Sequence, residues 1–307
     1  VSIMNSLLKA IAVGTRLILV GDVDQLPSVG PGNVLKDIIH SGCFEVVKLE
    51  KIFRQAAESE IIMNAHKINK GEPVTLNKYS KDFLFVKRNN PDAIIAAMCT
   101  LIKEKLPDYV HADRKDIQIL TPTRKSAVGA QRLNRIMQQY LNPPSADKME
   151  KEVGDTIYRV GDKVMQIKNC EDISNGDIGY ITSITRDDTD SVLTVDFGDG
   201  RIAEYDGSDL EMLDLAYAST IHKSQGSEYK SVIINLQCAH AVMLVRPLVY
   251  TAITRAKERV LIVGERRALC IAIKRTDTEQ RGTMLSARIK ELISNVKGDH
   301  DNGNLAQ

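Results

Sequence analysis

Two polar clusters near the end of the chain carry the side chains that phosphate chemistry needs. The first cluster lies between Ala218 and Tyr229 and combines hydroxyls, amides and charged groups, namely Thr220, His222, Lys223, Ser224, Gln225, Gly226 and Glu228. The second cluster, Tyr250 to Lys257, contains Arg255. Such groups suit phosphates and nucleic-acid backbones better than a metal or an acyl group. A plain amphipathic turn at His222–Glu228 is the alternative.

Buried strands are expected to position both clusters. Val232–Leu236 and Val260–Val263 are apolar and rich in β-branched residues, which is typical of strands inside an α/β sheet. Open α/β sheets build ligand sites from polar residues at the ends of such strands. The clusters are therefore predicted to lie at the ends of buried strands.

A glycine- and proline-rich loop, Gly21 to Gly32, offers a second candidate site. It follows a predicted strand, Arg16–Val20, and contains Asp22, Gln25 and Pro27. A carboxylate, an amide and several glycines can lie against a nucleotide and orient a water molecule or a γ-phosphate. The alternative is a structural turn, since turns also favour Gly, Asp and Pro.

Two arginines and one basic segment extend this interpretation. The guanidinium groups of Arg54 and Arg255 suit the charge that develops on a transferred phosphoryl group. Either arginine alone could be a surface residue, but the two together favour a function. The segment that begins at Thr121 and Arg124 continues to Arg132 and Arg135, and predicts a patch that holds phosphates. A solvated helix face explains this patch almost equally well.

The remaining pattern predicts an α/β domain with an all-β insertion. Strands at 83–86 and 117–120 alternate with helices at 93–105 and 128–141, which indicates a parallel sheet. From about 150 to 213, short alternating segments between turn dipeptides predict a small antiparallel barrel. Residues 187–214 contain ten acidic residues and one Arg, so much of the barrel surface should repel a phosphate backbone. Further elements are expected at the ends of the chain, namely a helix at 33–41, a strand at 46–49, a helix at 53–70 and a disordered tail beyond Val296.

Composition limits the function classes. The 307 residues suffice for two domains, and the net charge of +1 means that any nucleic-acid site is a local patch. Five scattered cysteines indicate free thiols in a reducing cytoplasm, and no apolar run is long enough to span a membrane. No G-x-x-x-x-G-K-[ST] loop for ATP phosphates occurs in the chain. Because the chain opens at Val1 in an expected helix, we expect it to be part of a longer protein.

Four segments in order resemble motifs III to VI of superfamily 1 helicases. These segments are Gly21–Asn33, Ile52–Gln55, Ala218–Glu228 and Val249–Lys257. The sequences Gln-Leu-Pro-Ser-Val-Gly-Pro-Gly and His-Lys-Ser-Gln-Gly-Ser-Glu are similar to the motifs of the RecD-like branch. Helicases of that branch move 5′ to 3′ on single-stranded DNA. The predicted barrel resembles the SH3-like insertion of that branch.

The resemblance implies roles for individual residues. Gln25 would sense the γ-phosphate of ATP, and Arg54 and Arg255 would reach that phosphate as arginine fingers. Other nucleotide-binding residues would be Gly21, Asp22, Gln55, Gly226 and Glu228, the last on the ribose. Contacts to DNA would come from Pro27, Thr121, Arg124, Thr220, His222, Lys223, Ser224 and Gln225. No metal ligand is expected in the chain, because the motifs that bind the ATP phosphates and Mg²⁺ would lie upstream of Val1.

The resemblance also implies a division into five parts. The parts are the end of a first RecA-like motor domain (1–50), the first part of a second motor domain (51–145), the SH3-like barrel (146–213), the second part of that motor domain (214–275), and a C-terminal helix with a disordered tail (276–307). The implied function is the C-terminal portion of an ATP-dependent 5′-to-3′ DNA helicase in the cytoplasm. It could act alone, in a complex of repair or recombination proteins, or in a relaxase. The alternative is a non-catalytic module that binds single-stranded DNA or a protein.

Overall fold

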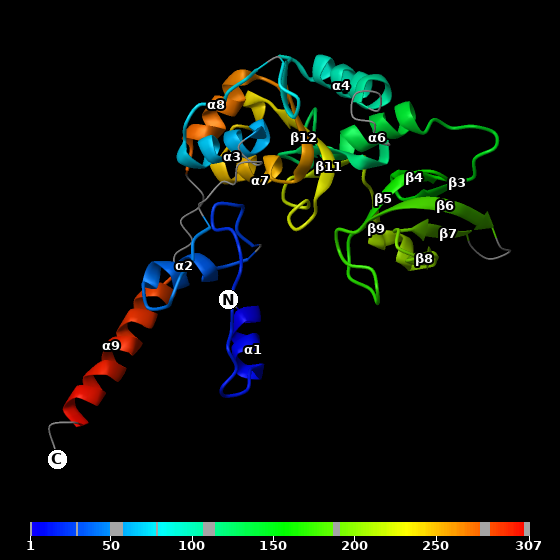
Figure 1. Cartoon of the computed structure of the whole chain (residues 1–307). Coiled ribbons are helices and arrows are strands. Elements are labelled where there is room, and N and C mark those ends of the chain that lie inside the picture. The colour runs from blue at the N-terminus through cyan, green and yellow to red at the C-terminus, as the bar shows by residue number, and fades with distance from the viewer. Residues whose placement is uncertain are drawn as a thin grey trace. The chain divides into compact units, whose positions relative to one another are not determined.

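The computed structural model describes residues 2–28, 30–49, 58–77, 79–106, 114–186, 191–276 and 283–303. The chain forms two compact units (Figure 1). The first unit comprises Val1–Ala56 together with Asp277–Gln307, and the second comprises Ala57–Thr276. The candidate site residues are distributed over both units.

A five-stranded parallel sheet forms the centre of the second unit. Its strands, in spatial order, are β1 (Phe83–Lys87), β12 (Ala256–Gly264), β11 (Tyr229–Leu236), β2 (Ile117–Thr121) and β10 (Ala218–Thr220). Each neighbouring pair is parallel. Strands β11 and β2 are almost completely buried, as expected for apolar strands that are covered on both faces. The predicted parallel α/β sheet is confirmed.

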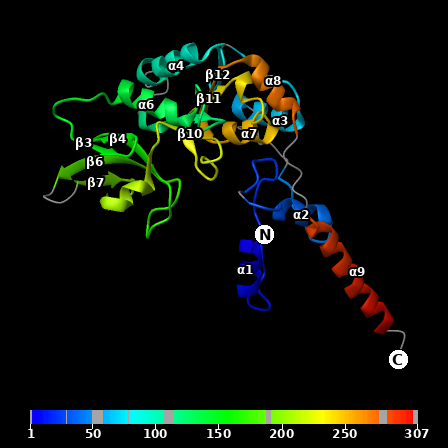
Figure 2. The same ribbon diagram turned by 180° about the vertical axis from the view of Figure 1, so that it is seen from behind.

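Helices cover both faces of this sheet. On one face lie α4 (Pro91–Thr100), which continues as a π-helical turn (Leu101–Lys105), and α6 (Ala130–Leu141) (Figure 1). On the other face lie α3 (Glu60–Lys70), α7 (Arg246–Ile253) and α8 (Arg266–Lys274) (Figure 2). Short 3-10 helices lie at Arg114–Asp116, Gly207–Met212 and Cys238–His240. Met98 and Leu133 pack against Ile119 and Ile233 in the core between α4, α6 and the sheet.

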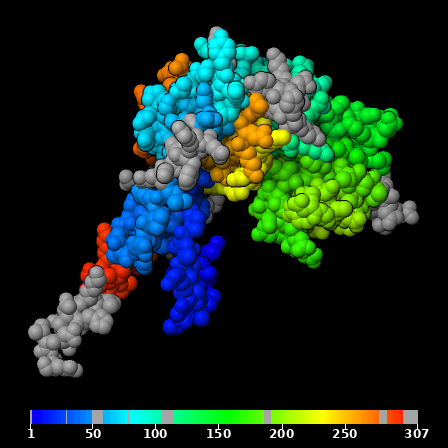
Figure 3. Space-filling model, viewed as in Figure 1, coloured from blue at the N-terminus to red at the C-terminus, as the bar shows by residue number. Residues whose placement is uncertain are grey.

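An antiparallel insertion separates the two halves of this α/β fold. It begins with a hairpin of β3 (Glu150–Val153) and β4 (Thr156–Arg159). A five-stranded antiparallel sheet follows, with β8 (Ile202–Tyr205), β7 (Ser191–Asp196), β6 (Ile178–Arg186), β5 (Lys163–Gln166) and β9 (Leu213–Leu215) in that order. Along β7, fully buried residues alternate with partly buried ones, so one face of the strand packs on the insertion's own core. We call residues 150–215 the insertion; they form a compact body, green in Figure 3.

The first unit differs from the prediction in two respects. Its helices are α1 (Ser2–Ala10), α2 (Val34–Ser41) and α9 (Leu285–Gly303), and α2 contacts α9. The strands predicted at 16–20 and 46–49 are absent, and Ile18 and Val20 are 76% and 93% exposed. A strand requires hydrogen bonds to a neighbouring strand, and no described residue of this unit belongs to a strand. The tail predicted to be disordered is helical as far as Gly303, because extending an existing helix costs little.

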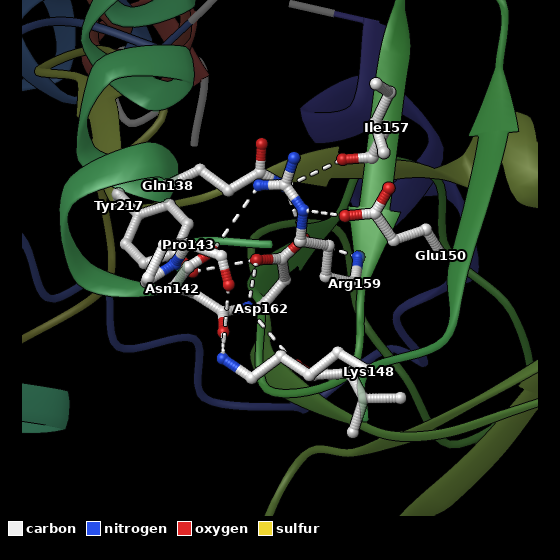
Figure 4. A network of polar contacts seen from close by, with 10 residues as sticks. Gln138, Asn142, Pro143, Lys148, Glu150, Ile157, Arg159, Asp162 and Tyr217 are labelled. Carbon is white, nitrogen blue, oxygen red and sulfur yellow. Dashed lines mark hydrogen bonds and ion pairs between the residues drawn. The ribbon is translucent and has the colours of Figure 1, made fainter. Parts of the chain in front are cut away.

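A buried polar network joins the insertion to α6 (Figure 4). The carboxylate of Asp162, which is 0% exposed, accepts hydrogen bonds from Gln138 Nε2 at 2.5 Å and from Asn142 Nδ2 at 2.7 Å. It also accepts bonds from the Arg159 amide at 2.7 Å and from the Tyr217 hydroxyl at 2.9 Å. Burial raises the pKa of the Asp162 carboxyl, and these bonds partly offset that rise. The network fixes the insertion to the helix that precedes it.

A buried lysine makes a second connection between the insertion and the parallel sheet. Lys163 of β5 is 5% exposed, and its Nζ donates to the carbonyl oxygens of Lys115 and Ile117, each at 3.1 Å. Burial lowers the pKa of Lys163 to about 8. The unfolded chain, in which a lysine titrates near 10.4, therefore binds more protons than the folded chain between about pH 8 and 10.

This difference predicts a pH-dependent stability. Relative to a Lys163→Met variant, the wild-type free energy of unfolding should rise by about 2 kcal/mol between about pH 8 and 10. Urea denaturation of both proteins across this range measures the difference. A difference that stays constant with pH would show that Lys163 titrates normally.

Candidate functional site

Two loops begin side by side at the carboxyl edge of the parallel sheet. The last residue of β2, Thr121, is in register with the last residue of β10, Thr220. The amide of Ile221 also donates to the carbonyl oxygen of Thr121 at 3.0 Å. The loop 122–128 and the loop 221–228 therefore start from adjacent points, although they are far apart in the sequence.

The loop 122–128 is held firmly against the start of α6. The amides of Ala130 and Gln131 donate to the carbonyl oxygens of Thr123 and Arg124, so loop carbonyls accept bonds from the first amides of the helix. Gly129 is needed at this approach, since a Cβ there would lie 2.6 Å from the Arg124 carbonyl oxygen. The loop thus presents its side chains from a fixed backbone.

Thr121 holds this loop in place from inside the protein. Its side chain is 0% exposed, and its hydroxyl donates to the Val128 carbonyl oxygen at 3.0 Å and accepts from Asn235 Nδ2 at 3.0 Å. In this structure the Thr121 hydroxyl is buried and is engaged by Val128 and Asn235.

A basic cavity lies beside the loop 122–128. It has a volume of about 350 Å³ and is lined by Arg124, Lys125, Ser126, Gln131, Arg132 and Arg135. Four of these six side chains are cationic. Arg132 has Asp92 as a partner at 3.7 Å, an exposed pair that contributes little to stability. The predicted basic patch is therefore a hollow of positive charge, which attracts phosphate groups.

The structure brings two of the predicted DNA-binding residues, Arg124 and Lys223, to a single carboxylate. Lys223 Nζ lies 3.3 Å from Asp214 Oδ2, and Arg124 Nη2 lies 4.0 Å from the same oxygen. The insertion's last strand, β9, supplies this carboxylate. The basic groups of the two loops thus lie close together in space.

The loop 221–228 places its polar residues at different depths. Ser224 is 0% exposed and its hydroxyl donates to the Ile221 carbonyl oxygen, so this side chain shapes the loop and cannot be reached by a ligand here. His222 is partly buried, and burial lowers its pKa. The hydroxyl of Thr220 accepts from the Lys223 amide at 3.3 Å, and Gln225 is partly buried. Of the residues predicted to contact DNA here, Lys223 is the exposed one.

The same loop then crosses to the opposite edge of the sheet. Because β10 and β11 both run parallel to β2, the chain between them must pass from the carboxyl ends of the strands to the amino ends. Gly226 adopts a φ of 85° on this path, a conformation that other residues rarely adopt. At the amino edge, the amide of Tyr229 donates to the Arg255 carbonyl oxygen at 2.8 Å. The loop thus connects the two polar clusters.

Arg255 is held inward at this amino edge. Its side chain is 7% exposed. Its guanidinium donates to the carbonyl oxygens of Ser227 at 3.1 Å and Thr251 at 3.2 Å, and to the Thr254 hydroxyl at 3.3 Å. The arginine therefore links the loop 221–228 to the helix α7.

Glu228 lies at the same edge but is exposed. Its carboxylate pairs with Lys257 Nζ at 3.0 Å, and both side chains are more than half exposed. Such a pair stabilises the fold little, so the carboxylate can exchange its partner for a ligand hydroxyl.

The remaining predicted residues belong to the first unit or lie outside the description. Gly21 and Asp22 are exposed, and Gln25 and Pro27 are partly buried. Gln25 Nε2 donates to Asp22 Oδ2 at 3.0 Å, and the Asp24 amide donates to Asp22 Oδ1 at 3.0 Å, so Asp22 organises this loop. Arg54 and Gln55 lie outside the described residues.

Two residues at the site were not predicted, namely Asp214 and His240. His240 is 4% exposed, its Nε2 lies 3.5 Å from the Ser126 hydroxyl, and burial lowers its pKa. Neither residue belongs to a polar motif. Asp214 had one signal in the sequence, its place in the acidic run next to the motif that contains Lys223.

The described residues give two further findings. Nowhere in them do three or more His, Cys, Asp or Glu side chains gather in a way that could hold a metal ion. No helix within the described ranges has both the length and the apolar character that crossing a membrane requires.

Comparison with known proteins identifies helicase domains in this chain. The model of the ATP-dependent RecD-like DNA helicase SH3 domain matches residues 133–197, and the UvrD-like helicase C-terminal domain matches residues 215–263. An AAA domain model matches residues 2–86. The resemblance to RecD-like helicases is confirmed by the first two matches, which together cover most of α6, most of the insertion and the loop 221–228.

Individual proteins are similar to this chain over most of its length. The chain is 36% identical to the ATP-dependent RecD2 DNA helicase of Deinococcus radiodurans over 291 residues, which cover 94% of this chain and 38% of that protein. It is 28% identical to the RecBCD enzyme subunit RecD of Mycolicibacterium smegmatis, with 94% of this chain and 52% of the relative covered. A crystal structure of Pif1 helicase from Bacteroides in complex with ADP-AlF3 and single-stranded DNA aligns at 19% identity and a TM-score of 0.48, covering 92% of this chain and 67% of that one. The chain thus spans about half or less of the length of the two curated relatives.

Proposed function

We propose that this chain, whose domains are those of RecD-like superfamily 1 helicases, is part of an ATP-dependent 5′-to-3′ DNA helicase. Its second unit would bind single-stranded DNA and contribute to the nucleotide site. The observation that carries this proposal is the path of the loop 221–228, which joins a basic surface at one edge of the sheet to Arg255 at the other. In this proposal, nucleotide turnover at one edge would be coupled to DNA binding at the other through this loop.

The basic surface suits a DNA backbone. Arg124, Lys125 and Arg135 are exposed around the cavity, and Lys223 is exposed next to them. Such groups neutralise phosphates without regard to base sequence, as a translocating protein requires. Thr121 and Ser224 would position the two loops from inside.

The opposite edge suits a nucleotide. In the proposed active state, Arg255 would give up a backbone partner and direct its guanidinium at the γ-phosphate of ATP, whose hydrolysis supplies the energy for translocation. Glu228 would exchange Lys257 for a ribose hydroxyl, and Gly226 would let the loop approach the nucleotide closely. From the resemblance, we also propose a nucleotide-binding role for residues of the first unit, namely Gly21, Asp22, Gln25, Arg54 and Gln55. Pro27 would contact DNA.

The salt dependence of DNA binding tests the basic surface. The logarithm of the affinity for fluorescent oligothymidine should fall linearly with the logarithm of the salt concentration. Replacing Lys125 and Arg135 with Gln should weaken binding and flatten this slope by about 1.4, since each lost contact to a single strand is worth about 0.7. Fluorescence anisotropy at several salt concentrations measures both quantities.

A matched pair of substitutions serves as the control. Arg266 and Lys274 are exposed on α8, which covers the other face of the sheet. Replacing both with Gln removes the same charge and should leave the slope unchanged. Equal effects of the two pairs would mean that the cavity is not the DNA site. Absence of salt-dependent DNA binding by the wild-type chain would favour a module that binds a protein partner.

A further inference from the structure

The carboxylate of Asp214 lies between the two basic loops on a rigid support. Asp214 is the middle residue of β9, which pairs with β5 through the register of Met165 with Asp214. Its neighbours Leu213 and Leu215 are buried in the core of the insertion, at 4% and 6% exposure. The backbone of Asp214 is therefore fixed, and its side chain is directed away from that core.

The partners of Asp214 both come from outside the insertion. Lys223 belongs to the loop 221–228 and lies 3.3 Å from Oδ2, while Arg124 belongs to the loop 122–128 and lies 4.0 Å away. The side chains of Arg124, Asp214 and Lys223 are 59%, 32% and 37% exposed, so solvent and ligands reach all three. One carboxylate oxygen of Asp214 therefore pairs with two cations at a position that solvent can reach.

A carboxylate and a phosphate offer the same kind of partner to Arg and Lys, namely anionic oxygens that accept charge-assisted hydrogen bonds. A DNA phosphate that binds Arg124 and Lys223 must therefore compete with Asp214. Because exposed ion pairs are weak, this competition adjusts the affinity for DNA and does not block binding.

We propose that the carboxylate of Asp214 pairs with Arg124 and Lys223 in place of a DNA phosphate. It thereby lowers the affinity of the second unit for single-stranded DNA. This inference rests on the proposed DNA-binding function. A translocating protein must release each phosphate that it binds. A carboxylate beside the two cations favours that release because it can take the place of the phosphate. Through Asp214, the insertion takes part in DNA binding although most of its charge is acidic.

Removing the carboxylate tests the proposal. Asp214→Asn should bind oligothymidine about threefold more tightly than wild type at low salt. Glu211→Gln is the matched control, because Glu211 is an exposed acidic residue of the adjacent 3-10 helix and belongs to no ion pair among the described residues. This control should change the affinity by far less.

A double-mutant cycle separates a local effect from a general loss of negative charge. In a protein that also carries Arg124→Met and Lys223→Met, the substitution Asp214→Asn should give no gain in affinity. Thermal unfolding of each variant checks that the insertion remains folded.

The outcomes distinguish this inference from its premise. If wild type binds DNA and Lys223→Met weakens binding, but Asp214→Asn binds no more tightly than Glu211→Gln, the role of Asp214 is overturned and the proposed function stands. A gain that persists without Arg124 and Lys223 overturns the role in the same way. If wild type shows no salt-dependent binding of DNA, both proposals fail.

Discussion

Replacing Arg255 with alanine in the full-length protein is expected to lower the rate of ATP hydrolysis by about 10³-fold or more, since an arginine finger contributes about 10³–10⁵ to phosphoryl transfer. Affinity for single-stranded DNA should stay within a few-fold of wild type, because Arg255 lies at the edge of the sheet opposite the basic loops. Steady-state ATP hydrolysis with saturating oligothymidine measures the first effect, and fluorescence anisotropy measures the second.

Two controls separate chemistry from folding. Arg255 bonds to the backbone of Ser227 and Thr251, so its loss also costs stability, and Arg255→Lys retains a charge with fewer donors. Arg266→Ala removes an exposed arginine from α8 and should leave hydrolysis unchanged. If Arg255→Ala remains folded and hydrolyses ATP at the wild-type rate, Arg255 has no role at the phosphate.

The second large effect is expected at the junction between the insertion and α6. Asp162→Ala removes the acceptor of four hydrogen bonds and leaves the buried donors of Gln138, Asn142 and Tyr217 without that partner. Each buried donor that loses its acceptor costs about 1–3 kcal/mol, so we expect a total loss of about 3–5 kcal/mol. Urea denaturation should show a loss of that size in the free energy of unfolding.

Two further variants serve as comparisons for Asp162→Ala. Asp162→Asn retains one acceptor oxygen and should lie between wild type and Asp162→Ala. Asp172→Ala removes an exposed carboxylate from the same insertion and should change stability by less than about 0.5 kcal/mol. A loss below about 1 kcal/mol for Asp162→Ala would mean that the network does not hold the insertion in place.

The sequence predicts the second unit and the helices α1 and α2 of the first unit, but not the conformation at 16–20 and 46–49. The strands β11 and β12 can be predicted because their apolar, β-branched sequences are themselves typical of buried strands. The runs at 16–20 and 46–49 look similar, but whether such a run becomes a strand depends on pairing, which a local pattern does not contain. The contact between α2 and α9 joins opposite ends of the chain and has no sequence signal for the same reason.

The candidate site is predicted by residue type but not by geometry. The motifs contain Arg124, Lys223 and Arg255, yet only the structure shows that Arg124 and Lys223 meet and that Arg255 faces inward. Thr121 and Ser224 look like ligand-binding hydroxyls in sequence, although both are buried. Asp214 was missed because it belongs to no polar motif and because one of its partners, Arg124, is distant in the sequence.

Unwinding of tailed duplexes by the full-length protein in the presence of ATP tests the central claim most directly. A duplex with a single-stranded 5′ tail and one with a 3′ tail differ only in the direction of travel that unwinding requires. Our account predicts ATP-dependent strand separation of the 5′-tailed duplex, little or none of the 3′-tailed one, and loss of this activity in Arg255→Ala. Unwinding from the 3′ tail alone, or no unwinding of either duplex despite DNA binding, would contradict it.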